Sequence, residues 1–390
     1  MRIGWFVTCM LAMTLSLQAQ EKQEEKWYER LSLGGYMQVR YNGLFETNPD
    51  LYCEQCDENW GSEGGGLSFR RIRFKIKGQI TPHIFVYFQP DFAKSVGEEH
   101  FVGRVKDAYV DVGVDEASEF RFRIGQSKVP YGYENMQSSS HRIPLDRDDA
   151  MNSGMKDERD LGVFFYWATQ KQRRLWKQLR KAGLSGGDFG MFAFGFYNGQ
   201  TANHYDENKE FHLVTRFTFP ITIGNQVIEP GIQAYTGKYV VTEHGSTIEV
   251  NPDGYVDQRV GASFVLYPQP FGIQAEYNIG KGPEYDVATQ SIAVKPLQGG
   301  YITCSYYIHK WGQDFYPFVR YQYYDGGKKH ELDARSYAVH DTEVGVEWHP
   351  FKHFELVTEY TFSDRRFEDD VNPFNHQKGS LMRIQAQVKF

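Results

Sequence analysis

A closed, membrane-spanning barrel of 16 antiparallel strands is the fold class that this 390-residue sequence predicts. Three observations predict it. Apolar and polar side chains alternate along most of the chain after residue 30, the connections between alternating segments are long and short in turn, and the last such segment ends the chain on Phe390. An open sheet edge in lipid would leave backbone groups without partners, so the last strand must pair with the first.

The alternation is clearest between residues 71 and 77, where isoleucine and phenylalanine alternate with arginine and lysine. One face of this segment is therefore apolar and the other is cationic. The same period of two marks the other predicted strands, each of about 9–11 residues. Their centres lie near Met37, Val86, Tyr109, Phe122, Phe164, Phe194, Val214, Ile232, Phe264, Ala275, Ile302, Val319, Val346, Leu356 and Ile384.

Long and short connections follow one another, which is typical of an outer-membrane barrel with long external loops and short periplasmic turns. A soluble β-sandwich has no reason to segregate them in this way. Long connections are predicted at 42–66, 93–104, 129–159, 237–257 and 325–341, and short turns at 78–82, 113–118, 268–271 and 349–353. Segment 169–188 is long and basic where a short turn is expected, and we interpret it as a short amphipathic helix in the periplasm.

The N-terminus has the pattern of an export signal. A basic residue, Arg2, precedes an uncharged stretch over 5–17, and small Ala19 precedes a strongly polar segment. We predict a signal peptide over 1–19, a periplasmic N-terminal segment over 20–30 and an outer-membrane β-barrel over 31–390.

The cysteines indicate a disulfide rather than a metal site. Cys53 and Cys56 form a C-x-x-C pair, and a zinc site needs four ligands. Exported proteins fold in an oxidising compartment, so we predict a local disulfide between these two residues.

Composition excludes several other classes. Aromatic residues make up 16% of the chain, which excludes a disordered protein, and the net charge of −7 argues against a nucleic-acid partner. The mean hydropathy of −0.57 and the lack of a long apolar run after residue 20 exclude a helical membrane bundle. No serine and histidine share a predicted strand face, so we do not expect an enzyme, a metal or a cofactor.

Several segments resemble the phosphate-selective porin O and P family of outer-membrane porins, in order, over roughly residues 31 to 390. The segments that carry the resemblance are Phe69–Gly78, Phe88–Phe92, Lys106–Asp111, Gly125–Gly132, Arg159–Val163 and Phe318–Tyr321. The resemblance implies a 16-stranded barrel with an inward-folded third external loop. It also implies a homotrimer in the outer membrane of a Gram-negative bacterium and passive diffusion of anions such as phosphate.

Charged side chains on the strands must face the lumen, because a charge at mid-membrane costs about 2–4 kcal/mol on the lipid face. Arginine and lysine can bind phosphate there, arginine through its planar fork of donors. The predicted anion path comprises Arg71, Arg73, Lys75, Lys77, Arg121, Arg123 and Lys128. Tyr131, Arg142, Arg147 and Arg159 are assigned to the constriction loop, and Arg216, Arg259 and Arg320 to the rest of the lumen.

Acidic and aromatic residues qualify this interpretation. The same alternation places carboxylates such as Asp91, Asp107 and Glu343 inside, so a general, weakly selective porin or a plugged structural or adhesive barrel stays open. The acids of segment 146–149 are expected to form salt bridges that hold the loop to the wall. The aromatic residues expected at the lipid interfaces are Tyr41, Trp167, Tyr197, Tyr267, Tyr306, Trp348 and Tyr360.

Overall fold

The structure is a computed structural model that describes residues 26–53, 58–59, 66–96, 99–184 and 187–390. The predicted signal peptide over 1–19 and the start of the predicted periplasmic segment lie outside the described residues. The described part of that segment forms a short 3-10 helix, η1 (Trp27–Arg30), just before the first strand. Among the described residues, no helix is long and apolar enough to cross a membrane.

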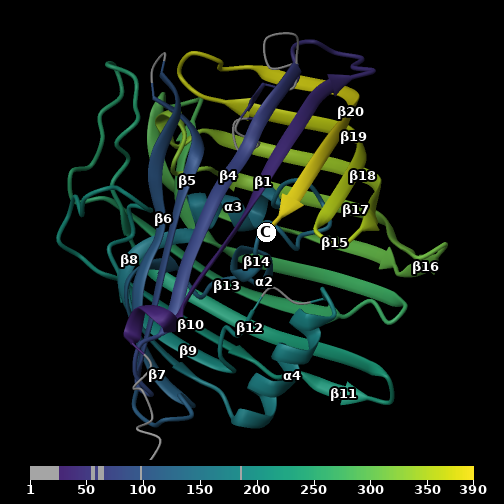
Figure 1. The fold of residues 1–390 in the computed structure, drawn as a ribbon. Coiled ribbons are helices and arrows are strands. Elements are labelled where there is room, and N and C mark those ends of the chain that lie inside the picture. The colour runs from purple at the N-terminus through teal and green to yellow at the C-terminus, as the bar shows by residue number, and fades with distance from the viewer. Residues whose placement is uncertain (1–25, 54–57, 60–65, 97–98, 185–186) are drawn as a thin grey trace, which may run out of the picture.

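Sixteen antiparallel strands close into a barrel, as predicted (Figure 1). Tyr36 of the first strand lies opposite Arg73 on one side and Lys389 of the last strand on the other, which closes the sheet. The strands are β1 (Leu31–Leu44), β4 (Gly66–Gln79), β5 (Ile84–Val96), β6 (Glu99–Gly113), β7 (Phe120–Lys128), β8 (Arg159–Trp167), β9 (Phe192–Tyr197), β10 (His212–Thr218) continued by β11 (Ile221–Ile223), β12 (Gln226–Tyr239), β13 (Tyr255–Leu266), β14 (Phe271–Asp286), β15 (Ser291–Tyr306) continued by β16 (Ile308–Lys310), β17 (Gln313–Gly327), β18 (Ser336–Phe351), β19 (Phe354–Glu368) and β20 (Asn375–Lys389).

Burial follows the predicted alternation. Along β10, residues from His212 to Thr218 are buried and exposed in strict turn, with Arg216 buried and Phe217 exposed. The buried side chains point into the barrel and the exposed ones point outward. The outward face of β10 is therefore mainly apolar, as contact with lipid requires. Two predicted interface aromatics are wrong: Tyr197 and Tyr267 are each only 1% exposed, because they point inward and pack against neighbouring side chains.

The strands are longer than predicted, reaching 16 residues in β14, β15 and β18. The predicted long connection at 93–104 is also wrong, since β5 runs to Val96 and β6 begins at Glu99. Neighbouring strands keep pairing beyond the apolar band, because each added pair satisfies backbone groups that would otherwise need water. We call the end of the barrel with the turns at 80–83, 114–119, 267–270 and 352–353 the short-turn end.

The third external connection, residues 129–158, folds into the barrel and is called the inner loop below (Figure 1). It contains α2 (Tyr133–Met136), α3 (Asp149–Gly154) and a 3-10 turn, η3 (Lys156–Glu158). Asp148 caps α3 by accepting a 2.9 Å hydrogen bond from the backbone N–H of Met151. Most residues of the inner loop are buried, so it is packed against the wall rather than free in the lumen.

The basic segment 169–188 contains a helix, as interpreted from the sequence. α4 (Gln170–Lys181) is capped by Thr169, whose side-chain oxygen accepts a hydrogen bond from the N–H of Gln172. The helix lies at the short-turn end of the barrel (Figure 1).

Smaller elements complete the external side. β2 (Tyr52–Cys53) pairs with β3 (Glu58–Asn59) in the first long loop, and η4 (Leu332–Ala334) lies in the loop before β18. Cys53 is disulfide-bonded, and its predicted partner Cys56 lies outside the described residues.

Candidate functional site

A β-bulge in β4 directs two consecutive arginines into the lumen. Gln38 of β1 lies opposite Arg71, but the next residue, Val39, lies opposite Phe69. Arg70 is therefore an extra residue on β4, and a bulge of this kind breaks the alternation of side chains between the two faces. Arg70 and Arg71 are both buried, with exposed fractions of 8% and 6%.

A second bulge, in β6, has the same effect. Gln89 of β5 lies opposite Asp107, whereas the following Pro90 lies opposite Val105, so Lys106 is the extra residue. Lys106 and Asp107 are both buried inside the barrel. The two bulges thus place Arg70 and Lys106 on the lumen side, where strict alternation would have put neither.

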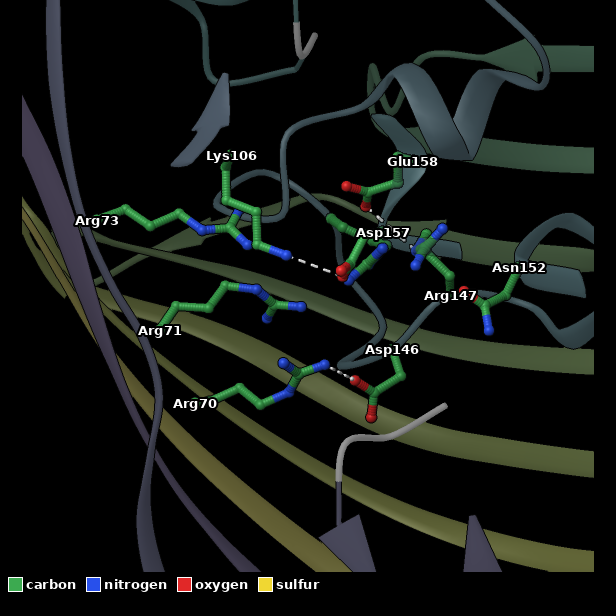
Figure 2. Close-up of a pocket in the computed structure, with 10 residues that line it drawn as sticks. Arg70, Arg71, Arg73, Lys106, Asp146, Arg147, Asn152, Asp157 and Glu158 are labelled. Carbon is green, nitrogen blue, oxygen red and sulfur yellow. Dashed lines mark hydrogen bonds and ion pairs between the residues drawn. The ribbon is translucent and has the colours of Figure 1, made fainter. Parts of the chain in front are cut away.

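The bulged strands face the inner loop across a narrow cavity with a volume of about 30 Å³. Figure 2 shows the β4 arginines reaching from one side toward acidic side chains of the inner loop. The strands contribute Arg70, Arg71, Arg73 and Lys106, and the inner loop contributes Arg142, Asp146, Arg147, Asn152, Asp157 and Glu158.

Most cations around this cavity have a carboxylate partner. Nη2 of Arg70 lies 3.2 Å from Oδ1 of Asp146, and Nζ of Lys106 lies 2.9 Å from Oδ1 of Asp157. The other ion pairs at the cavity include Arg73–Asp91 and Arg147–Glu158. The Arg70–Asp146 and Lys106–Asp157 pairs tie the inner loop to the wall, and all four pairs cancel part of the positive charge.

Arg71 and Arg142 differ from the other cations of the cavity. Neither has a carboxylate within 4.0 Å among the described residues. Nη1 of Arg71 donates to Oε1 of Gln38 at 2.8 Å, and Nη2 of Arg142 donates to the carbonyl of Leu145 at 3.4 Å. Nε of both residues and Nη1 of Arg142 are buried without a hydrogen-bond partner among the described residues. Because burying an unpaired charge is costly, an anion bound here would supply the missing partner.

A wider cavity of about 570 Å³ lies toward the short-turn end, and Arg73 lines both cavities. We call the two together the passage. The predicted path residues that line the wider cavity are Arg73, Lys75, Lys77, Arg121, Arg123 and Lys128. Arg159, assigned to the constriction loop from the sequence, lines it as well. Among the described residues, Lys75 and Lys77 have no carboxylate within 4.0 Å, so the unpaired positive charge continues along β4.

Acids of the inner loop also bind arginines of β1, β19 and β20. Asp146 lies 2.8 Å from Arg40 of β1 and also contacts Arg383 of β20, and Asp149 lies 3.0 Å from Arg365 of β19. The prediction that acids of segment 146–149 hold the loop by salt bridges is confirmed for Asp146 and Asp149, but not for Asp148.

The charge states of these loop acids differ with their neighbours. Burial alone would raise the pKa of Asp146, but Arg40 and Arg383 hold it well below the ordinary value. Asp148 caps α3 without such partners, and burial together with nearby Glu134 raises its pKa well above the ordinary value. Asp146 is therefore a strong anionic tie, whereas Asp148 acts as a capping acceptor.

The sequence profile of the phosphate-selective porin O and P family matches residues 54–390. The chain belongs to this family. Among curated proteins, no sequence relative of this porin is found.

Solved structures of other porins share the fold of this porin at low sequence identity. The outer membrane channel DcaP of Acinetobacter baumannii is 13% identical with a TM-score of 0.56, and covers 92% of this chain and 97% of its own. The anion-selective porin from Comamonas acidovorans is 10% identical with a TM-score of 0.55, and covers 92% and 99%. The trimer form of OmpT from Vibrio cholerae is 11% identical with a TM-score of 0.52, and also covers 92% and 99%.

Family and fold together make this porin a channel of the Gram-negative outer membrane. In such barrels the short turns face the periplasm. The 570 Å³ cavity is therefore the periplasmic part of the passage, and the narrow cavity lies further toward the outside.

Some predicted lumen residues lie inside the barrel but away from the passage. Arg216 is buried and lies 3.4 Å from Glu229. Arg259 donates a hydrogen bond to the hydroxyl of Ser153 in α3. Arg320 is fully buried against inner-loop Glu134. Tyr131 is also fully buried, and its ring packs edge-on against Tyr235, with 4.8 Å between ring centroids.

Sequence reasoning missed Arg70 and Lys106, since both fall on the wrong side of the alternation. The available signal was that each stands next to another charged residue, Arg71 or Asp107, within a membrane strand. Two consecutive charges cannot alternate faces without one meeting lipid, so such a pair indicates a bulge.

One group of side chains could hold a metal ion. Ligand atoms of Glu347, His349 and Glu355 lie within 4.8 Å of one another near the short-turn end. Nε2 of His349 lies 2.6 Å from Glu347, and Nζ of Lys389 lies 2.9 Å from Glu355. The group has its own charge partners, so it fits an ion-pair cluster as well as a cation site.

Proposed function

We propose that this porin is a passive diffusion channel that prefers small anions and binds oxyanions such as phosphate in its narrow cavity. The observation that carries the proposal is the pair Arg71 and Arg142, two buried guanidinium groups without a carboxylate partner among the described residues. Arg71 comes from the wall and Arg142 from the inner loop. An oxyanion between them can accept charge-assisted hydrogen bonds from both sides.

The wider, periplasmic cavity of the passage also supports a preference for anions. Lys75 and Lys77 follow Arg73 along β4 into the wider cavity, so a small anion meets one cation after another. A series of moderately strong sites lets an ion bind and still leave, which conduction requires. The name of one fold neighbour, an anion-selective porin, points in the same direction.

A general, weakly selective porin is the second candidate, and one observation favours it. Acids line the passage too: Asp107 pairs with Arg159 at 3.0 Å, and Asp111 pairs with Arg123 at 2.7 Å. Paired charges on one wall give a local field without a strong preference for one sign. The two candidates therefore differ in whether Arg71 and Arg142 dominate conduction.

We also propose that the porin is a homotrimer embedded in outer-membrane lipid. The family resemblance and the trimer form of the OmpT neighbour support this assembly. Native mass spectrometry in detergent tests it: a mass three times that of one chain is expected, and a single-chain mass would contradict it.

Planar-bilayer recording tests the proposed function. The reversal potential under a KCl gradient measures the ion preference, and phosphate added to KCl measures block of the single-channel current. We expect a chloride-directed potential and block by phosphate in the wild type. Arg71→Gln and Arg142→Gln should each weaken the block by about tenfold or more, since a hydrogen bond to a charged group contributes about 1.5–3 kcal/mol.

Arg174→Gln is the matched control, because it removes one arginine from the exposed face of α4, outside both cavities of the passage. A potential near zero without phosphate block would favour a general porin. No current at all from the refolded barrel would favour a plugged structural barrel and contradict a channel.

A further inference from the structure

The basic helix α4 is fixed to the inside of the barrel at the short-turn end. Nε1 of Trp176 donates to Oε2 of Glu229 at 2.9 Å, and the side-chain amide of Gln172 donates to the carbonyl of Pro220 at 3.1 Å. Trp176 and Leu179 are buried in an apolar cluster with inward-facing residues of β12 and β13. α4 is therefore a rigid part of the periplasmic mouth rather than a loose connection.

A further contact ties the helix to the passage wall. Nε of Arg173 lies 2.6 Å from Oδ2 of Asp188, and Asp188 also lies 3.2 Å from Nη2 of Arg121 on β7. Burial alone would raise the pKa of Asp188, but Arg121 and Arg173 lower it to about 2. This carboxylate is thus charged at neutral pH and bridges the helix to a strand that lines the passage.

The other face of α4 is cationic and unpaired. The helix contains no acidic residue, and its exposed basic side chains have no carboxylate within 4.0 Å among the described residues. These side chains are Lys171, Arg174, Lys177, Arg180 and Lys181. Arg180 and Lys181 lie in the last turn of the helix, and the other three lie along its length.

Arg180 has a special position among them. It lines the 570 Å³ cavity of the passage and also a second cavity of about 600 Å³ on the other side of the mouth, which Lys181 lines as well. Lys171, Arg174 and Lys177 line neither cavity. The last turn of α4 therefore brings positive charge to the mouth itself, and the rest of the basic face points away from it.

His141 of the inner loop lines the same two cavities and adds no charge. Burial lowers the pKa of His141 to about 3, and the nearby positive charges of Lys389, Lys75 and Arg180 act in the same direction. Of the two described residues that line both cavities, His141 and Arg180, only Arg180 is positively charged.

We propose that α4 is a fixed electrostatic filter at the periplasmic mouth and that Arg180, assisted by Lys181, decides which ions reach the passage from that side. The proposal rests on the proposed function only for the sign of the preferred ion. Charges at a confined, low-dielectric mouth raise the local concentration of counter-ions, and the effect decays over about 10 Å in 0.1 M salt. The filter therefore acts on ions arriving at the α4 end and leaves the Arg71–Arg142 cavity unchanged.

Two charge reversals on the same helix test the filter. Arg180→Glu/Lys181→Glu reverses the charges that line the cavities, and Arg174→Glu/Lys177→Glu reverses the same number of charges that do not. Current–voltage curves of single oriented channels are recorded in dilute KCl. In the wild type we expect the current to differ between positive and negative voltage. Arg180→Glu/Lys181→Glu should lose or invert this current asymmetry and lower the chloride-to-potassium permeability ratio severalfold. Arg174→Glu/Lys177→Glu should keep both quantities near their wild-type values.

Equal behaviour of the two double variants, or no change in the first, would overturn the filter. Phosphate block from the long-loop side separates the two proposals, because it should be the same in the wild type and in the Arg180→Glu/Lys181→Glu variant. A wild-type reversal potential near zero would contradict the anion preference while the comparison of the variants still decides the filter. If the double variant does not refold, Arg180→Gln alone should reduce the asymmetry by a smaller amount.

Discussion

On β4, Arg71 faces the passage without a carboxylate partner among the described residues, whereas Arg320, Arg365 and Arg383 on β17, β19 and β20 are at most 1% exposed and contact acids. All four are inward-facing arginines on membrane strands. The difference is the inner loop, which brings Glu134, Asp149 and Asp146 into contact with Arg320, Arg365 and Arg383, respectively.

This comparison shows that the role of an arginine in this lumen depends on whether the inner loop brings a carboxylate to it. An arginine with such a partner is structural, and one without it can bind an anion. An ion pair that is buried and well hydrogen-bonded holds the inner loop in place, and removing one partner leaves an uncompensated charge. An unpaired guanidinium beside a cavity can instead exchange anions. The following variants remove a carboxylate partner from a paired cation or test a group beside the passage.

The largest effect is expected for Asp149→Ala, which removes an inner-loop acid that binds Arg365 of β19. It leaves Arg365 and Lys328 with fewer acidic partners and should destabilise the barrel by roughly 3 kcal/mol. Urea unfolding in lipid vesicles measures the loss, and single-channel conductance should rise as the inner loop loosens. Asp286→Ala is the control, because its pair with Lys295 is partly exposed to solvent and contributes little to stability.

A pH-dependent effect on stability is expected at Asp188, which joins α4 to β7. The pKa of Asp188 is lowered to about 2, below the ordinary value of about 3.9, so its stabilising contribution is complete above that value and lost as the pH falls toward 2. Asp188→Asn should destabilise the barrel by roughly 2 kcal/mol at pH 6. Unfolding curves from pH 6 to pH 2 check this, and a difference that persists unchanged at pH 2 would contradict it.

A smaller effect is expected when an acid of the narrow cavity is removed. Asp157→Asn removes the carboxylate 2.9 Å from Lys106 and with it one negative charge, so phosphate block should strengthen by about tenfold. Asp364→Asn removes an acid outside the passage and is the control. Unchanged or weaker block in Asp157→Asn would show that pairing does not set the affinity of this cavity.

The smallest effect is expected at His141. Its pKa of about 3 means that it stays neutral between pH 5 and pH 8, so its titration should not alter conductance in that range. His141→Asn should have the same pH profile of single-channel current as the wild type. A conductance step near pH 6 that disappears in the variant would contradict this.

By itself, the sequence determined the barrel, its 16 strands and the inward direction of residues such as Arg73, Lys75 and Lys77. The physical reason is that lipid imposes a period of two on every strand and demands a closed sheet. It also determined that segment 146–149 would form salt bridges, because adjacent acids inside a basic lumen find cations.

Only the tertiary structure decided which cations stay unpaired. The bulges that turn Arg70 and Lys106 inward depend on the register between neighbouring strands, which local alternation does not encode. Likewise, Arg320 and Arg71 look alike along the chain, and only the path of the inner loop covers one and leaves the other beside a cavity. Long-range packing sets that path, so it has no signature in either strand.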